Sequence, residues 1–186
     1  GYLSKKMGLP INKFIVATNQ NDILHRAITK GTYYLEKVSE TISPSMDIQI
    51  ASNFERLIYD LNNFSDTKTI DAMKDIKEKG KYKINKDNLD KINYNFLSSR
   101  MNQDEVLKTI KSVYDKTNIV LDPHTAIGYG AFDKVNLNGN NIVLATAHPC
   151  KFPDAIEKAI NLKVELQKEL MYILNEKENY DIIENN

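Results

Sequence analysis

The sequence contains 186 residues, of which 41% are hydrophobic and 27% are charged, and its 25 basic residues balance its 25 acidic ones. This composition is ordinary for a soluble globular protein, and the lack of a basic excess argues against a general nucleic-acid binder. No apolar run approaches the roughly 18 residues that span a bilayer, so we expect no membrane partner. A single cysteine, Cys150, excludes an internal disulfide framework and fits a cytoplasmic protein.

The first thirty residues predict one α/β unit. Residues 1–10 are typical of the last turns of a helix, with Gly8 as a candidate C-cap and Pro10 preventing continuation. The apolar run 13–17 predicts a short buried strand. Polar residues 18–22 follow it and precede a helix over 23–30, which Gly31 closes.

The middle of the chain is predicted to be mainly helical. Residues 43–47 form a turn or a helix start, and apolar positions 54, 57, 58 and 61 have the spacing of an amphipathic helix. We expect further helices over 65–79, 87–98 and 102–116, with a short strand possible at 82–84. The charged region 64–117 is therefore predicted to be a helical excursion beside the sheet.

An α/β pattern returns in the last third of the chain. Residues 118–121 predict a short strand, and a helix then starts at 122–125 and runs through Phe132. After a turn at 138–140, the run 142–144 predicts a third strand, and Pro153 starts another helix. No repeat or low-complexity linker interrupts the sequence, so we expect a single domain over 1–186.

Three of the predicted strands end in polar sequence, at 18–22, 122–125 and 146–148. If these strands are parallel neighbours, their ends meet at one edge of the sheet and line a cleft. The alternative is that the same residues act only as helix caps and turns, where Asn, Asp, Thr and Pro are favoured.

Other chemistry receives little support. The histidines His25, His124 and His148 lack metal-ligand spacing, so we expect no metal site. A nucleophile set of Cys150, His148 and Asp122 is conceivable, but a lone cysteine is more often a small core residue.

Five segments, in this order, resemble threonine synthase of the bacterial and fungal type. They are Phe14-Ile-Val-Ala-Thr-Asn-Gln-Asn-Asp-Ile-Leu24, Ser43-Pro-Ser-Met-Asp-Ile-Gln49, Ser52-Asn-Phe-Glu-Arg-Leu57, Asp122-Pro-His-Thr-Ala126 and Leu144-Ala-Thr-Ala-His-Pro-Cys-Lys-Phe-Pro153. Nothing in 64–117 adds to the resemblance.

The resemblance implies a three-layer αβα fold of the tryptophan-synthase-β-like type, which is fold type II of the pyridoxal 5′-phosphate enzymes. It implies conversion of O-phospho-L-homoserine and water to L-threonine and phosphate. The family's Schiff-base lysine and its phosphate-binding loop lie upstream of the matching segments, and neither motif occurs here. We therefore expect the chain to be roughly the C-terminal 40% of such an enzyme, an incomplete part of its large domain that is inactive alone. Its expected partner is the N-terminal part of the same enzyme.

The resemblance also implies roles for individual residues. Thr146 matches the position whose hydroxyl faces the pyridine nitrogen of the cofactor, which would leave that nitrogen largely unprotonated. The other cofactor-side candidates are Ala147, Thr18 and Asn19, and the chain offers no catalytic residue of its own. The substrate-side candidates are Asp22, Ser43, Ser45, Asp47, Asn53 and Arg56. Arg56 suits a phosphate group, but it can equally pair with Asp60 on the helix surface.

Two alternatives stay open: another lyase or dehydratase with the same cofactor and fold, or an α/β interaction module without catalysis. A partial domain would expose apolar faces and a sheet edge. We therefore expect the isolated chain to dimerise, exchange elements or aggregate.

Overall fold

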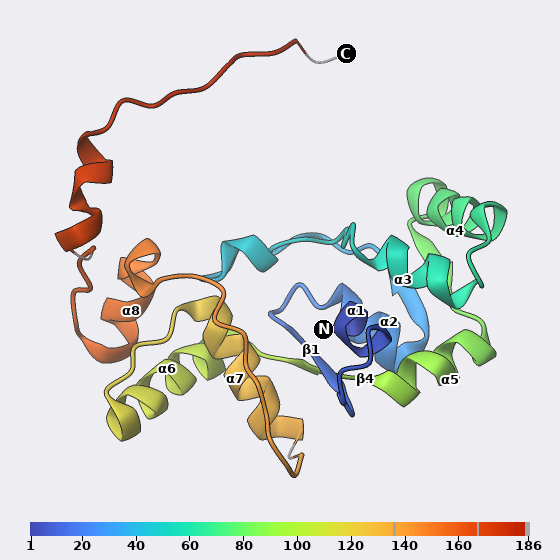
Figure 1. Ribbon diagram of the computed structural model, residues 1–186, viewed down its shortest axis with the longest axis horizontal. Helices are drawn as coiled ribbons and strands as arrows, with labels where there is room; N and C mark the ends of the chain where they lie inside the picture. Colours follow the sequence, from blue (N-terminus) through green and yellow to red (C-terminus); the bar gives the residue numbers. More distant parts are fainter. Residues whose placement is uncertain (136, 167, 185–186) are drawn as a thin grey trace.

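The structure is a computed structural model that describes residues 1–135, 137–166 and 168–184. Its body has two helical lobes on either side of a short central sheet, and a C-terminal arm extends away from the body (Figure 1). One lobe contains α2 to α5, and the other contains α6 to α8.

The central sheet pairs two strands that are far apart in the sequence. Strand β1 (Phe14–Thr18) lies parallel to β4 (Phe96–Arg100), with Phe14 opposite Phe96 and Thr18 opposite Arg100. The position of β1 agrees with the prediction, but the predicted helix over 87–98 is wrong beyond residue 95. The region 64–117 is mainly helical, yet it also supplies the strand that pairs with β1.

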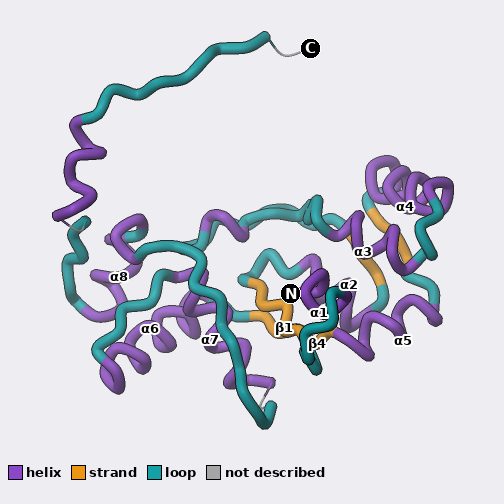
Figure 2. Tube along the Cα trace, in the orientation of Figure 1, coloured by secondary structure: helices purple, strands orange, loops and turns teal. Residues whose placement is uncertain are grey.

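The first lobe is built around a cluster of apolar side chains. Its elements are α2 (Ile23–Lys30), β2 (Thr32–Tyr34), α3 (Phe54–Leu61), α4 (Asp66–Lys79), β3 (Lys81–Lys83) and α5 (Lys86–Asn95). Gly31 ends α2 with a left-handed φ of 66°, a conformation that glycine adopts without steric cost. This turn leads into β2, which pairs antiparallel with β3 in a second small sheet beside α3 and α4 (Figure 2). The buried stack of Tyr33 on Phe54 ties the sheet to α3.

The second lobe packs three helices: α6 (Gln103–Thr117), α7 (Pro123–Val135) and α8 (Pro153–Ile160). Its core contains Ile110, Ile127 and Ile156, none of which is accessible to solvent. Strand β1 joins the two lobes because successive side chains of a strand point to opposite faces. Val16 packs against the first cluster, and Ala17 packs against the second.

Two predicted strands, 118–121 and 142–144, are irregular in the structure. Ile142 and Leu144 are 88% and 73% exposed, although both sit in a strongly apolar run. A strand forms only where a neighbouring strand satisfies its N–H and C=O groups. No described segment pairs with either run, so sequence preference alone does not make them strands.

Short elements complete the chain. Helix α1 (Tyr2–Lys6) leads to β1. The described residues also include the 3₁₀ segments η1 (Pro44–Met46), η2 (Pro149–Lys151) and η3 (Lys168–Asn175). Segment η3 lies in the C-terminal arm (Figure 1). Within the described residues, none of the helices has the length and apolar character needed to cross a membrane.

Candidate functional site

The carboxyl ends of the two parallel strands mark the candidate site. Thr18 ends β1 opposite Arg100, and its hydroxyl donates to the backbone oxygen of Ser99 at 3.3 Å. Ligands of open α/β sheets bind beyond this edge, in the space that the following loops enclose. The residues after Thr18 therefore decide what the edge can bind.

Asn19 follows Thr18 and is almost completely buried. Its side-chain nitrogen lies 2.9 Å from the Thr41 hydroxyl, 3.0 Å from the Ser43 hydroxyl and 2.7 Å from Asp47 Oδ1. Its side-chain oxygen accepts the backbone N–H of Asn21 at 2.8 Å. Asn19 thus fastens loop 39–47 over the end of β1.

Asp47 is the main acceptor of this loop. Its Oδ1 accepts from the Asn21 side chain at 2.9 Å and from the Thr41 hydroxyl at 2.7 Å, and its Oδ2 accepts the Thr41 backbone N–H at 2.7 Å. Charge-assisted hydrogen bonds of this kind are stronger than neutral ones. Asp47 therefore holds the loop in one conformation.

A second group of polar residues, at the start of α7, is joined to this loop. The Ser45 backbone N–H donates to His124 Nε2 at 3.3 Å, and His124 Nδ1 lies 3.0 Å from Asp122 Oδ1. Because the carboxylate is an acceptor, Nδ1 carries the proton and Nε2 is free to accept. The ring of Phe152 packs 4.7 Å from that of His124, between centroids. His124 thus connects η1 to α7.

The Asp122 carboxylate is also connected to Thr146 through the Thr125 hydroxyl. The Thr125 hydroxyl donates to Asp122 Oδ2 and accepts the backbone N–H of Thr146 at 3.0 Å. The hydroxyls of Thr125 and Thr146 are 3.4 Å apart. Thr146 itself is exposed, and Ala147 beside it is half-buried.

The three polar sequences do come together, but the prediction that they end three parallel strands is wrong, because only the first follows a strand. Residues 18–22, 122–125 and 146–148 are joined through loop 39–47 and by direct hydrogen bonds. The capping alternative is also correct in part, because Asp122 accepts the first free N–H groups of α7 and His148 accepts the Cys150 N–H at 3.2 Å. The conceivable nucleophile set is not assembled, since Asp122 is bonded to His124 rather than His148.

Asp22 lies beside this edge between two arginines. Its carboxylate is 3.3 Å from Arg26 Nε and 3.5 Å from Arg100 Nε. Arg26 is buried, pairs also with Glu36, and donates to Gln49 at 3.0 Å. Sequence reasoning missed Arg26 and Arg100, although the i, i+4 spacing of Asp22 and Arg26 was a visible signal.

Asn53 and Arg56 lie elsewhere. Both are exposed at α3, where Arg56 Nη2 donates to Asn53 Oδ1 at 2.6 Å. The alternative pairing of Arg56 with Asp60 is wrong, because Asp60 is bonded to Tyr2 and Lys6. Arg56 lines an open pocket of about 370 Å³, but the carboxylates of Glu55 and Asp66 line it too and disfavour a phosphate there.

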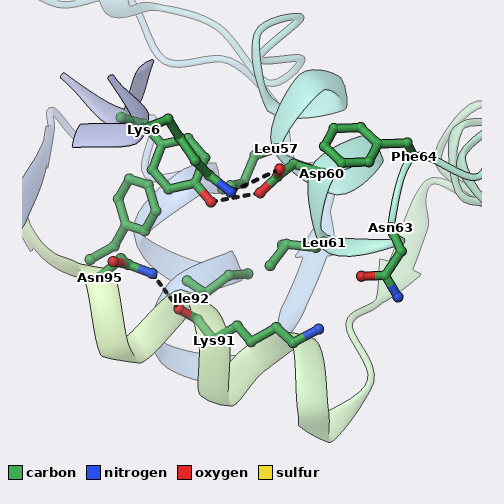
Figure 3. Close-up of a pocket in the computed structure, with 11 residues that line it drawn as sticks. Lys6, Leu57, Asp60, Leu61, Asn63, Phe64, Lys91, Ile92 and Asn95 are labelled. Atoms are coloured by element: carbon green, nitrogen blue, oxygen red, sulfur yellow. Dashed lines mark hydrogen bonds and ion pairs between the residues drawn. The ribbon is translucent and has the colours of Figure 1, made fainter. Parts of the chain in front are cut away.

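Another pocket, of about 330 Å³, lies between α1, α3 and α5 (Figure 3). Asp60 accepts from the Tyr2 hydroxyl at 2.6 Å and from Lys6 Nζ at 3.1 Å. Burial opposes the charge of Asp60, but the two hydrogen bonds and the positive charges of Lys6 and Lys91 together outweigh burial and hold the pKa of its carboxyl below its ordinary value. Phe96, which also lines the pocket, starts β4, so this pocket lies at the amino ends of the strands, opposite to the candidate site.

Comparison with solved structures defines the class of fold. The chain superposes on a crystal structure of PLP-bound threonine synthase from Brucella melitensis with a TM-score of 0.92 and 40% identity, covering 98% of this chain and 40% of that one. It superposes on threonine synthase from yeast with a TM-score of 0.85 and 37% identity, covering 95% of this chain and 40% of that one. The fold is therefore that of the type II pyridoxal-phosphate enzymes, as predicted.

Sequence comparison shows the proteins to which the chain is similar. Residues 125–186 match the family model described as "Threonine synthase, C-terminal". Threonine synthase of Pseudomonas aeruginosa is 40% identical over 161 residues, which cover 86% of this chain and 34% of the relative. Over nearly its whole length, the chain is similar to the C-terminal part of threonine synthases. It spans between about a third and two fifths of their length.

Proposed function

We propose that the chain forms the C-terminal part of a pyridoxal 5′-phosphate-dependent threonine synthase, which converts O-phospho-L-homoserine and water to L-threonine and phosphate. The observation that carries this proposal is the superposition of nearly the whole chain on a PLP-bound threonine synthase. The chain would supply one wall of the active site, and the N-terminal part of the enzyme would supply the lysine and the phosphate loop. We further propose a cytoplasmic location and a single, incomplete domain over 1–186.

The residues at the candidate site fit the cofactor. Thr146 is exposed and carries a hydroxyl, and Ala147 beside it has a small side chain. Thr18 and Asn19 end the strand at the same edge, and their polar groups are already held in place. When bound, the cofactor would act as an electron sink for the amino-acid substrate. We propose that these four residues lie on the cofactor side.

The substrate-side candidates fall into three groups by their contacts. Ser43, Ser45 and Asp47 belong to loop 39–47, and we propose that this loop shapes the wall that faces the substrate. Asp22 orients Arg100 at the end of β4. Asn53 and Arg56 are bonded to each other on α3, and no described hydrogen bond or ion pair joins them to the loop. Their proposed contact with the substrate would come from the exposed end of Arg56.

The proposal is tested by joining the chain to the N-terminal part of the Brucella melitensis enzyme, a product we call the joined enzyme. We expect the joined enzyme to bind one pyridoxal phosphate, to hold it covalently after borohydride reduction, and to release phosphate from O-phospho-L-homoserine. The chain alone should do none of these. If the joined enzyme folded into a stable structure but did not bind the cofactor, the proposal would be contradicted and a non-catalytic module would be favoured.

Substrate choice separates threonine synthase from related lyases. The joined enzyme should release phosphate and form threonine from O-phospho-L-homoserine, and it should have little activity on free serine or threonine. The opposite preference would favour a dehydratase of the same fold. The variant Arg56→Lys tests phosphate binding, since a bidentate contact is lost while the charge is kept. An unchanged KM would assign Arg56 to the helix surface.

A further inference from the structure

The guanidinium of Arg26 is 3% exposed and has partners on four sides. Nε and Nη1 form ion pairs with Asp22, at 3.3 Å, and with Glu36, without the geometry of hydrogen bonds. Nη2 donates to the backbone oxygen of Tyr34 at 3.1 Å and to Gln49 Oε1 at 3.0 Å. The guanidinium carbon lies 4.2 Å from the centre of the Tyr34 ring. A planar guanidinium can make these contacts together, whereas the ammonium of a lysine cannot.

The partners of Arg26 are the two ends of one loop. Tyr34 and Glu36 precede loop 39–47, and Gln49 follows it. The Glu36 backbone N–H also donates to Gln49 Oε1 at 3.3 Å, so the two ends are in contact. Apart from η1, segment 36–49 contains no helix or strand. A loop whose ends meet in this way is an Ω-loop, and Arg26 closes its neck.

The tip of this loop lies at the candidate site. Ser45 is exposed, and its backbone N–H donates to His124 on α7. Asn19 and Asp47 hold the inner side of the loop, where Ser43 is buried. Because the tip is part of the same short loop, a change at the neck moves the exposed side chain of Ser45.

We infer that Arg26 is a positioning residue, which closes the neck of loop 36–49 and so fixes Ser45 at the wall that faces the substrate. This inference rests on the proposed function, in which the substrate is O-phospho-L-homoserine. Arg26 is buried behind the loop and does not itself touch the substrate. Its loss therefore weakens substrate binding more than it changes cofactor binding or the chemical step.

The first test follows the loop by hydrogen exchange in the joined enzyme before substrate is added. In Arg26→Lys, peptides from segment 36–47 should exchange about fivefold faster, which corresponds to one lost hydrogen bond, and peptides from α6 serve as the internal control. A faster exchange confined to the Glu36 amide would show that Asn19 and Asp47 fix the loop by themselves, and it would overturn the inference.

Gln49 provides a matched pair of variants for the same contact. Gln49→Met keeps the length of the side chain but removes the oxygen that accepts from Arg26, and its loop should exchange as in Arg26→Lys. Gln49→Glu keeps that oxygen and should match the unmodified enzyme. If both Gln49 variants behaved alike, the neck would not depend on this hydrogen bond. This pair still decides the question if Arg26→Lys does not fold.

The second test separates KM from kcat. Arg26→Lys and Gln49→Met should each raise the KM for O-phospho-L-homoserine about tenfold, the effect of one lost hydrogen bond to a charged group, and change kcat less than about twofold. Both variants should still bind one pyridoxal phosphate per chain, and Gln49→Glu should keep the KM of the unmodified enzyme. A lower kcat or a loss of cofactor with an unchanged KM would indicate a general loss of folded enzyme and would contradict a positioning role.

The double variant shows whether the two residues act through one contact. Arg26→Lys combined with Gln49→Met should have a KM no higher than Arg26→Lys alone, because the same hydrogen bond is lost in each case. A KM raised by the product of the two single effects would mean that they act separately. Absence of phosphate release from the unmodified joined enzyme would instead overturn the proposed function, while the exchange test would still decide whether Arg26 closes the loop.

Discussion

At the scale of single residues, the polar groups of the candidate site are mostly bonded to one another. Asn19 and Asp47 use their side chains to hold loop 39–47, and Asp22 balances Arg26 and Arg100. Since these groups are engaged, they shape the site more than they offer free hydrogen bonds. Thr146 differs, because its side chain is exposed at the end of the network.

The lowered pKa of Asp60 predicts how the stability of the protein depends on pH. Its folded-state pKa is lowered, so its contribution to stability is present above its ordinary pKa and is lost as pH falls through the folded value. We expect the gap in thermal midpoint between the joined enzyme and its Asp60→Asn variant to be constant near neutral pH and to shrink below about pH 4. Scanning calorimetry across this range measures it.

Tyr2→Phe serves as the control for this prediction. It removes one of the two hydrogen bonds to Asp60 while keeping the aromatic ring that packs on Phe14 and Phe96. The pKa of Asp60 should move back toward its ordinary value, so the acid loss of stability should be smaller and should be complete at a higher pH than in the unmodified protein. A gap that is independent of pH in both proteins would show that Asp60 is not held by this pair.

At the scale of elements, the start of α6 joins three parts of the fold. The Asn102 side chain accepts the Glu105 N–H at 2.9 Å, and Glu105 accepts the Asn102 N–H at 2.8 Å. Glu105 also pairs with Lys134 at 2.7 Å, and Lys134 donates to the backbone oxygen of Arg100 at 2.8 Å. The pair with Lys134 is the main cause that lowers the pKa of Glu105.

We therefore expect Asn102→Ala to destabilise the joined enzyme by about 1 kcal/mol, the usual effect of a lost helix cap. Asn102→Asp keeps a side-chain acceptor and should be close to neutral. Urea unfolding of the three proteins measures the difference. If Asn102→Ala and Asn102→Asp unfolded at the same urea concentration, the cap would not contribute.

Most helices could be predicted from the sequence because their signals are local. Apolar spacing, caps and closing glycines place α2, α3 and α4 within one residue of their observed bounds. Strand β4 could not be predicted, since Phe96 and Leu97 continue the apolar pattern of α5 and become a strand only by pairing with β1. The error at 142–144 is the reverse, a strand-like sequence without a described partner. Tertiary context overrides local preference in both cases.

In the candidate site, too, local features could be predicted from the sequence and long-range contacts could not. The polar segments 18–22 and 122–125 could be recognised from the sequence because each separates an apolar run from a predicted helix. The bonds among them were not, because Asn19 to Ser43 and Ser45 to His124 depend on how loop 39–47 folds back over β1. Thr125 was part of a noticed sequence, but its link to Thr146 crosses 21 positions and has no sequence signal.

At the scale of the whole molecule, large apolar side chains remain exposed on many elements, and three groups of them lie close together in the sequence. These groups are Leu3, Met7 and Leu9 near α1, Ile142 and Leu144 in the irregular segment, and Met171, Tyr172, Ile173 and Leu174 in η3. Exposed apolar surface spread over several elements promotes association.

We predict that the isolated chain forms dimers or larger assemblies at micromolar concentration, and that the joined enzyme has far less tendency to do so for this reason. Light scattering after size-exclusion chromatography measures both. Replacing Ile142 and Leu144 by Ser should reduce assembly of the isolated chain, whereas replacing Lys30 and Lys37 should not. A stable, monodisperse monomer of the isolated chain would contradict this prediction.

The pairing of β1 with β4 also determines when the central sheet can form during synthesis of the chain. The Thr18 hydroxyl bonds to a residue 81 positions further along the chain. At roughly 5–20 residues per second, β1 leaves the ribosome some seconds before its partner exists. The nascent chain meanwhile carries an unpaired strand of Phe, Ile and Val, which is the kind of segment that molecular chaperones hold. The first lobe can fold around α2 to α4 in that interval, but the edge that carries Thr18 and Asn19 is completed only when β4 has been made.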